Sequence, residues 1–236
     1  MKVLAFSNHV TLGGTVSDKV YYSHDNFGTL WADFLLSTFP EEATSRDKGF
    51  AIRCKTYGPC AEALQKESRK EVCVIGELKA ADFSYGKYSW RESYLLLTEI
   101  GFGVYPEYMK FGINRFEGMG KSCAYSVAGA GVPGYTAFAL LGQDRHGDDQ
   151  RLYCWTDRVL AEEEREILHE DMSISVSGRL RPGYEIDWKR DSDESIMRKC
   201  NNFVMVADEI RPMLMKDLQG AFKGVIPGDE RREPNQ

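Results

Sequence analysis

The sequence predicts an all-β protein with short helices, built from two tandem copies of one five-stranded Greek-key barrel. Three observations lead to this fold class: a duplicated series of β-rich segments, the order of elements within each copy, and a length of 236 residues. That length suits two domains of about 100 to 120 residues. The composition, 42% apolar and 28% charged, is that of a globular protein. No apolar run reaches the roughly 18 to 20 residues of a membrane helix.

The duplication is visible in four matched blocks that follow one another in the same order. Phe50 precedes Gly76 by 26 residues, and Leu152 precedes Gly178 by the same interval. The other matched blocks are GTLWADFLL, ending at Leu36, with GYTAFALL, ending at Leu141; NHVTLGG with NRFEGMG; and SYLLLTEI with NFVMVADEI. Each block alternates with period two or is a short β-rich run, so the repeated unit consists mainly of strands.

Each copy is expected to contain three strands, a short helix and two further strands. In the first copy the strands are expected at 8–14, 30–36, 50–57, 71–78 and 93–100, and the helix at 58–68. The second copy has the same order, with RVLAEEEREILHE as the stronger helix. This is the order of the oligonucleotide-binding (OB) barrel, which holds ligands on strands 2 and 3 and on the 1-2 and 4-5 loops. The predicted domains are 1–106 and 107–213, followed by a flexible tail at 214–236.

Two stretches look like nucleotide-binding signatures, but the repeat explains both. GMGKS takes the place of LGGTV in the first copy, and Arg115 stands where a phosphate loop needs its first glycine. GAGVPG takes the place of the first hairpin, where Pro133 and Gly134 are typical turn residues. Asp149 lies about 20 residues further on, as a ribose-binding acid would, so a dinucleotide site is kept as a minor alternative.

No catalytic or metal-binding pattern is found in the sequence. The cysteines have neither C-x-x-C spacing nor a histidine at zinc spacing, and reduced packed thiols are the simpler interpretation. No Ser/His/Asp, Cys/His or paired-carboxylate arrangement is identifiable. We therefore predict no cofactor, no metal and no enzymatic activity, with an enzyme as the least favoured class.

Three stretches of the first copy resemble the bacterial and bacteriophage single-stranded DNA-binding proteins. These are NHVTLGG, CKTYGPCAEAL and VCVIGELKAADF, whose order and spacing match that family over most of residues 5–102. The second copy keeps SISVSGRLR but has TDRVLAEE at its helix entry, and the tail lacks that family's acidic, Phe-terminated tip. The resemblance implies an OB fold, binding of single-stranded DNA, and a base-stacking aromatic at Phe83.

The alternation of the third strand gives an independent prediction of the same chemistry. Arg53, Lys55 and Tyr57 share one face of that strand, and Tyr153 and Trp155 share the corresponding face in the second copy. Cations bind phosphates, and flat rings stack on bases. Any single aromatic is more simply explained by packing, and Trp31 by the core, so the combination carries the prediction. The predicted nucleic-acid-binding residues are Trp31, Arg53, Lys55, Tyr57, Lys79, Phe83, Tyr85, Trp90, Tyr153, Trp155, Arg179, Arg181, Tyr184 and Trp188.

The net charge of −6 argues against a protein that binds duplex DNA by neutralising phosphates. The best-fitting function is binding of single-stranded nucleic acid, above all DNA during replication, recombination or repair. The alternative is an OB module of the protein-docking or primosome type. The sequence does not separate DNA from RNA, and it leaves homodimers and contacts with replication or recombination proteins open. Because MKVLAF is too short for an export signal, a cytoplasmic location in a bacterium or a phage-infected host is expected, without a membrane partner.

Overall fold

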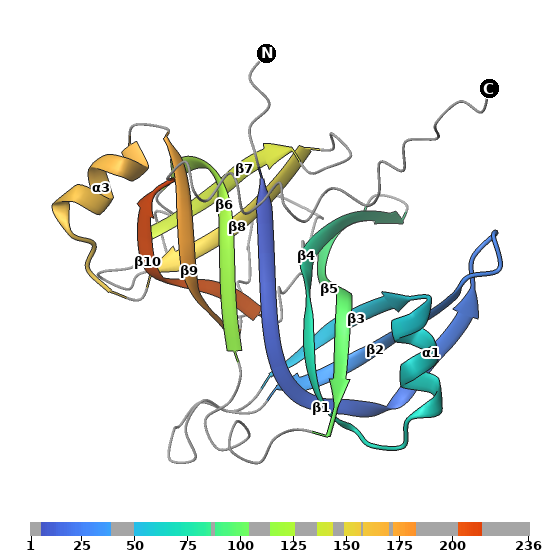
Figure 1. Ribbon diagram of the computed structural model, residues 1–236. Helices are drawn as coiled ribbons and strands as arrows, with labels where there is room; N and C mark the ends of the chain where they lie inside the picture. Colours follow the sequence, from blue (N-terminus) through green and yellow to red (C-terminus); the bar gives the residue numbers. More distant parts are fainter. Residues whose placement is uncertain are drawn as a thin grey trace, which may run out of the picture.

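The computed structural model describes residues 6–38, 50–85, 88–103, 114–125, 136–143, 149–156, 158–169, 172–182 and 203–213. It shows two β-barrels that lie next to each other, with β1 and β6 between them (Figure 1). Barrel 1 consists of β1 (Ser7–His24), β2 (Leu30–Thr38), β3 (Ala51–Tyr57), α1 (Pro59–Lys66), β4 (Glu71–Tyr85) and β5 (Tyr88–Phe102). Barrel 2 consists of β6 (Asn114–Tyr125), β7 (Thr136–Gln143), β8 (Asp149–Thr156), α3 (Glu162–His169), β9 (Ser173–Pro182) and β10 (Phe203–Pro212).

Both barrels are closed rings of five strands with the same connectivity. In barrel 1, β1 pairs with β2 and β4, β2 pairs with β3, β3 pairs in parallel with β5, and β5 pairs with β4. Barrel 2 repeats this ring in the order β6, β7, β8, β10, β9 and back to β6. The one parallel contact in each ring is the mark of the OB topology. The predicted all-β fold with short helices is confirmed.

A two-residue alternation produces the core of each barrel. On β3, Ile52, Cys54 and Thr56 are buried, whereas Arg53 and Lys55 are partly exposed. The largest fully buried side chains come from both barrels and include Phe116, Phe138, Leu12 and Leu36. The core of the described residues forms one continuous cluster. The sheet faces that point away from this cluster are therefore left for ligand contacts.

The two barrels join through an antiparallel β1–β6 ladder with approximate two-fold symmetry. Val10 and Phe116 are equivalent residues, because each pairs with the glycine of its own fourth strand, Gly76 or Gly178. They also pair directly with each other. On either side of them the ladder pairs Asn8 with Gly118 and Leu12 with Asn114. When a residue pairs with its own equivalent, the two-fold axis of the contact passes between the two. The two barrels are therefore arranged like the subunits of a two-fold dimer, joined here into one polypeptide.

The matched glycines leave room for a neighbouring strand. A Cβ on Gly76 would collide with the carbonyl oxygen of Leu96, and a Cβ on Gly178 would collide with that of Val206. Both strands that approach are irregular at this point, because the pairing skips one residue just beyond the contact. Glycine is therefore required in both copies for close backbone approach.

The pairing corrects the register of the sequence repeat at two places. Leu36 is equivalent to Leu140, and Leu141 follows one position later, because Leu36 pairs with Ile52 and Leu140 pairs with Leu152. The same pairs make Leu152 equivalent to Ile52 instead of Phe50. The connections between strands differ in length, so no single offset relates the copies. The two-residue slip in the third strand left the predicted faces unchanged, because faces alternate with a period of two, whereas a one-residue slip matches the buried Leu36 with Leu141 on the other face.

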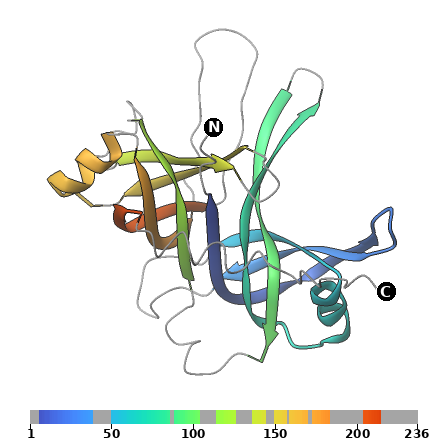
Figure 2. The same ribbon diagram turned by 45° about the horizontal axis from the view of Figure 1, so that its top comes forward.

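The region between strands 4 and 5 of barrel 1 was predicted as a loop, and the structure shows paired strands. Residues 79–85 continue β4 and residues 88–90 open β5, with Phe83 opposite Trp90 and Tyr85 opposite Tyr88. Aromatic residues favour paired strands, and this preference outweighs the polar turn composition that suggested a loop. The pairing makes an arm, residues 79–85 and 88–94, that projects beyond the barrel (Figure 2).

The second-copy helix is shorter than the sequence suggested. It was expected over 158–170 and to be the stronger of the two, but α3 spans Glu162–His169 and has eight residues, as α1 does. Arg158 pairs with Glu164 at 2.6 Å and donates to the backbone oxygen of Asp208, which holds the preceding segment outside the helix. The 106/107 domain boundary and the 214–236 tail lie outside the described residues and stay predictions.

The five described cysteines are all free thiols. Cys54 and Cys154 are buried, Cys60 and Cys73 are partly buried, and Cys123 is exposed. Burial raises the pKa of the Cys54 and Cys154 thiols far above the usual value, which keeps these two protonated. Cys200 lies outside the described residues.

Candidate nucleic-acid interface

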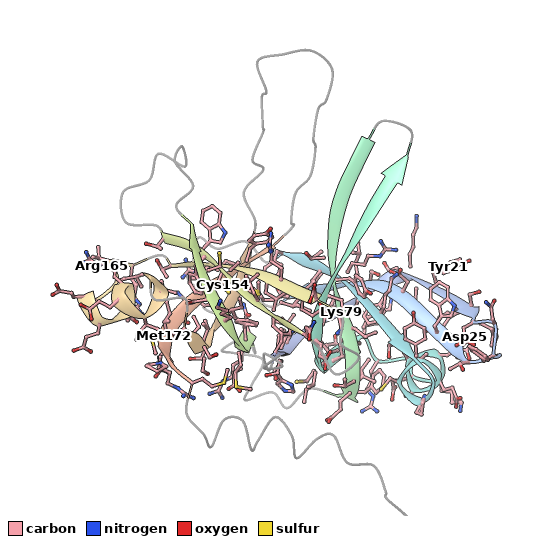
Figure 3. All side chains as sticks on the ribbon, turned by 90° about the horizontal axis from the view of Figure 1, so that it is seen from above. Tyr21, Asp25, Lys79, Cys154, Arg165 and Met172 are labelled. Atoms are coloured by element: carbon pink, nitrogen blue, oxygen red, sulfur yellow. The ribbon has the colours of Figure 1, made fainter. Side chains whose placement is uncertain are left out.

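The outward positions of barrel 1 form a continuous surface across β1, β2, β3, β5 and β4. Their neighbours along each strand point into the core, which fixes the outward set by alternation. We call this set the barrel 1 face: Tyr21, Trp31, Asp33, Leu35, Arg53, Lys55, Tyr57, Lys79, Tyr94 and Leu96. Figure 3 shows Tyr21 toward the outer end of barrel 1 and Lys79 near the base of the arm. The face therefore extends from the β1–β2 hairpin to the start of the arm.

Aromatic side chains occupy the hairpin side of this face. The rings of Tyr21 and Trp31 lie 5.5 Å apart between centroids and are tilted by 51°. Trp31 pairs across β2 and β3 with Tyr57, which is 46% exposed, while Tyr21 is 63% exposed. Trp31 belongs to the outward set, so the alternative that it is a core residue is not supported. Three exposed or partly exposed rings thus stand on adjacent strands.

Cations and another aromatic occupy the arm side. Lys55 Nζ lies 4.8 Å from the centroid of the Tyr94 ring, and Lys79 is the cross-strand partner of Tyr94. Burial raises the pKa of Tyr94, and the neighbouring Tyr57 raises it further, against the opposing effect of Lys79 and Arg53. Lys79 also forms an ion pair with Glu77 at 3.0 Å. Lys55 makes no ion pair within the described part of the chain, and the contact shown for its ammonium is the one with the Tyr94 ring.

Arg53 is held by a carboxylate on the neighbouring strand. Its Nε donates to both oxygens of Asp33 at 3.0 Å, and Nη2 donates to Oδ2 at 2.7 Å. The side chains are 40% exposed for Arg53 and 15% exposed for Asp33. This bidentate pair uses the Nε–Nη2 edge of the guanidinium, which is one of the edges that can bind a phosphate with two hydrogen bonds.

The β1–β2 hairpin presents a phenylalanine at its tip. Phe27 is 95% exposed. The turn beneath it is fixed because Asp25 Oδ1 accepts hydrogen bonds from the amides of Phe27 at 2.9 Å and Thr29 at 2.8 Å. Gly28 has a φ of 81°, which favours glycine. The hydrogen bond from the amide of Thr29 lowers the pKa of Asp25 most, and the one from the amide of Phe27 lowers it further. The carboxylate is therefore charged at neutral pH, where it keeps accepting the two bonds that form the turn.

The corresponding surface of barrel 2 has a different chemistry. Tyr153 and Trp155 stand where barrel 1 has Arg53 and Lys55, because Cys154 and Cys54 pair with equivalent phenylalanines. Both aromatic side chains are partly buried. Opposite Trp155 and Tyr153 on β7 are Ala137 and Ala139, at the positions that Asp33 and Leu35 hold in barrel 1. Barrel 2 therefore replaces an ionic set by aromatics facing alanines.

Two predicted arginines of barrel 2 lie on β9. Arg179 and Arg181 correspond to Glu77 and Lys79, because Gly178 is equivalent to Gly76. Arg179 Nη1 pairs with Asp208 at 2.6 Å. Arg181 is thus the residue that matches a cation of the barrel 1 face, while Arg179 replaces an acid.

The structure brings together five of the predicted residues and adds several that sequence reasoning missed. Trp31, Arg53, Lys55, Tyr57 and Lys79 share the barrel 1 face. Phe83, Tyr85 and Trp90 belong to the two strands of the arm. Tyr184 and Trp188 lie outside the described residues. The missed residues are Tyr21, Phe27, Asp33, Leu35, Tyr94 and Leu96. For the strand residues among them, the signal in the sequence was the same alternation, as for Tyr94, which precedes the buried Leu95 on β5, and Tyr21, which lies in a part of β1 beyond the strand expected at 8–14.

Neither a metal-binding cluster nor a membrane-spanning helix is found in the described part of the chain. Within it, no group of three or more His, Cys, Asp or Glu residues is placed to hold a metal ion. Its helices are too short and too polar to cross a membrane.

Comparisons with known proteins identify the fold. No family model matches the sequence, and no curated protein matches it. Among solved structures, wild-type single-stranded DNA-binding protein from Thermus aquaticus is similar with a TM-score of 0.59 at 15% identity, covering 89% of this chain and 94% of that one. A deletion variant of the same protein gives 0.59 and 15%, with 91% and 97% coverage. The predicted resemblance to single-stranded DNA-binding proteins is confirmed at the level of the fold.

Proposed function

We propose that this protein binds single-stranded nucleic acid, DNA above all, along the barrel 1 face and without catalysis. The observation that carries the proposal is the composition of that face. The exposed rings of Tyr21 and Tyr57 and the partly exposed ring of Trp31 lie on the same face as the cations Lys55 and Lys79. A single strand needs both features, because its bases stack on flat rings and its phosphates bind cations.

The aromatic side of the face supplies most of the affinity in this proposal. Each stacked base contributes about 1 to 3 kcal/mol. Lys55 supplies the phosphate contact with the smallest free-energy cost, since it has no carboxylate partner to leave among the described residues. With a net charge of −6 for the whole chain, binding then depends more on stacking than on phosphate neutralisation, and duplex DNA, whose bases are already stacked, is a poor ligand.

The path of the strand beyond the barrel 1 face follows from the arm and from barrel 2. Phe83 and Trp90 are paired on the arm, which begins at Lys79 and Tyr94 on the face itself. In barrel 2, Trp155 and Tyr153 occupy the positions of the barrel 1 cations. We propose that the arm extends the binding surface and that barrel 2 adds stacking contacts with fewer charges.

The comparisons support this function because both similar structures are described as single-stranded DNA-binding proteins. Roles in replication, recombination or repair, a cytoplasmic location, a homodimeric state and recruitment of replication or recombination proteins are parts of the proposal that the fold alone does not supply.

A second candidate is an OB module that docks protein, and the asymmetry of the barrels favours it for barrel 2. There the equivalents of Arg53 and Lys55 are Tyr153 and Trp155, which suit an apolar protein surface as well as bases. In that case barrel 1 binds the strand and barrel 2 binds a partner.

Titration of tryptophan fluorescence with poly-dT, poly-U and duplex DNA tests the proposal. We expect saturable quenching by poly-dT, weaker quenching by duplex DNA, and a smaller signal in a Trp31→Phe variant, because Trp31 lies on the face. The poly-U arm measures the preference for DNA over RNA. Absence of saturable quenching by both single strands, or equal affinity for duplex DNA, would overturn the proposed function.

A further inference from the structure

We propose that Asp33 is a specificity-determining counter-anion within the binding surface: it occupies the phosphate-binding edge of Arg53 and so keeps the nucleic-acid backbone away from the centre of the barrel 1 face. This inference rests on the proposed function and deepens it. It assigns Asp33 a role, because an acid in the middle of a surface for a polyanion requires an explanation.

The geometry of the pair leaves that edge of Arg53 occupied. Three hydrogen bonds of 2.7 to 3.0 Å join Nε and Nη2 of Arg53 to the two oxygens of Asp33. The Asp33 side chain is only 15% exposed, so the carboxylate cannot turn into water without losing packing. A phosphate that approaches the same edge meets a carboxylate of like charge. The Nε–Nη2 edge of Arg53 is therefore not available to a phosphate while Asp33 holds it.

Two other cations of the barrel 1 face, Lys55 and Lys79, give the backbone another route. Lys55 stands two residues further along β3 and has no ion pair within the described residues, with its ammonium over the Tyr94 ring. Lys79, on the other side of Tyr94, shares its charge with Glu77. The phosphates are therefore directed to the side of the face nearest the arm, and the bases to the rings at Trp31 and Tyr57.

Barrel 2 is an internal comparison for this assignment. At the position of Asp33 it has Ala137, and at the position of Arg53 it has Tyr153. Barrel 2 thus lacks both the acid and the arginine. This is expected if Asp33 is present in barrel 1 because of Arg53. The replacement also shows that an alanine at this place is compatible with the barrel.

Variants at Asp33 test the inference. Asp33→Asn keeps the size of the side chain, and Asp33→Ala reproduces barrel 2 and serves if the first variant does not fold. We expect either variant to bind oligo-dT on the order of ten-fold more tightly, because Arg53 gains a phosphate through a charge-assisted contact. The plot of log affinity against log salt should become steeper by about 0.7, the value for one more phosphate neutralised on a single strand.

Two controls separate this mechanism from a general change in charge. Asp18→Asn removes the same charge from an exposed ion pair with Lys70 on barrel 1, and it should change the affinity little. In an Arg53→Ala background, the gain from Asp33→Asn should disappear. A gain that persists without Arg53, or a gain of equal size in Asp18→Asn, would overturn the inference.

A loss of affinity in folded Asp33→Asn and Asp33→Ala would also overturn it, because Asp33 would then orient Arg53 for binding instead of competing with the phosphate. Wild-type protein that fails to bind oligo-dT contradicts the proposed function itself, and this result is distinct from the variant results.

Discussion

Lys55 and Tyr94 meet at the parallel junction of β3 and β5, where the ammonium of Lys55 lies 4.8 Å from the centroid of the Tyr94 ring. An ammonium at this distance from a ring is attracted by its electrons, and it keeps hydrogen-bond donors for another ligand. The contact holds a cation over an aromatic on the arm side of the barrel 1 face. A group that can bind a phosphate and a ring that can stack on a base thereby stand next to each other.

Replacing Lys55 by alanine should weaken binding of oligo-dT about five-fold at moderate salt, the effect of one charge-assisted contact of roughly 1 kcal/mol. The salt dependence should fall by about 0.7 in log–log slope because one phosphate contact is lost. Fluorescence anisotropy at several salt concentrations measures both. Lys66→Ala, which removes a cation from an exposed pair with Glu62 on α1, is the matched control. An unchanged slope in Lys55→Ala would exclude Lys55 as a phosphate ligand.

The double change Tyr57→Ala and Phe83→Ala should weaken single-strand binding at least ten-fold without unfolding barrel 1. Tyr57 is 46% exposed on the face, so its loss leaves the buried core intact, and Phe83 pairs with Trp90 on the arm, beyond the barrel. The size of the loss follows from about 1 to 3 kcal/mol for each stacked base. Circular dichroism checks the fold, and a folded double variant with wild-type affinity would show that these two residues are not part of the site.

The alternation of residues predicts the fold and the faces because both follow from a period of two. Arg53, Lys55 and Tyr57 were placed on the outer face from the sequence alone, and the structure has them there. The matched positions of Gly76 and Gly178 revealed the repeat because both glycines solve the same steric problem. The alternation along single strands and the matched glycines were therefore sufficient to predict the architecture.

Contacts between strands were not predictable in the same way. The pairing of Arg53 with Asp33, and of Lys55 with Tyr94, depends on the register of neighbouring strands, which is set by turns and by core packing. The arm was missed because its turn composition suggested a loop. Phe27 was missed because an isolated aromatic in a turn has no periodicity.

Asn8→Ala should lower the free energy of unfolding by about 2 to 4 kcal/mol, since the loss of each buried partner costs roughly 1 to 3 kcal/mol. Asn8 is buried, donates from Nδ2 to the Leu78 oxygen at 3.2 Å, and accepts from the Leu78 amide at 2.5 Å. Asn114 makes the equivalent two bonds to Leu180. Urea denaturation of both alanine variants measures the effect, and a loss below about 0.5 kcal/mol in both would show that these bonds contribute little.

The ion pair between Glu164 and Arg158 should make stability fall in acid. Arg158 lowers the pKa of Glu164 below its value in the unfolded chain, so its contribution is complete above about pH 4.5 and is lost as the pH falls through the lower folded pKa. Thermal melts from pH 7 to pH 3 should therefore show a smaller acid loss for Glu164→Gln than for the wild type. Glu163→Gln, which removes a charge from an exposed neighbour, is the control. Identical acid losses in wild type and Glu164→Gln would contradict this role.

Photochemical cross-linking of oligo-dT to the full chain, followed by mass spectrometry of the peptides, tests the central claim most directly. The account predicts that the cross-linked residues fall on Tyr21, Phe27, Trp31, Tyr57 and Tyr94, and that excess unlabelled poly-dT removes the cross-links while duplex DNA does not. Cross-links confined to barrel 2, or to outward positions of barrel 1 outside the face such as Cys73 and Ile75 at the start of β4, would contradict the assignment of the barrel 1 face as the binding surface.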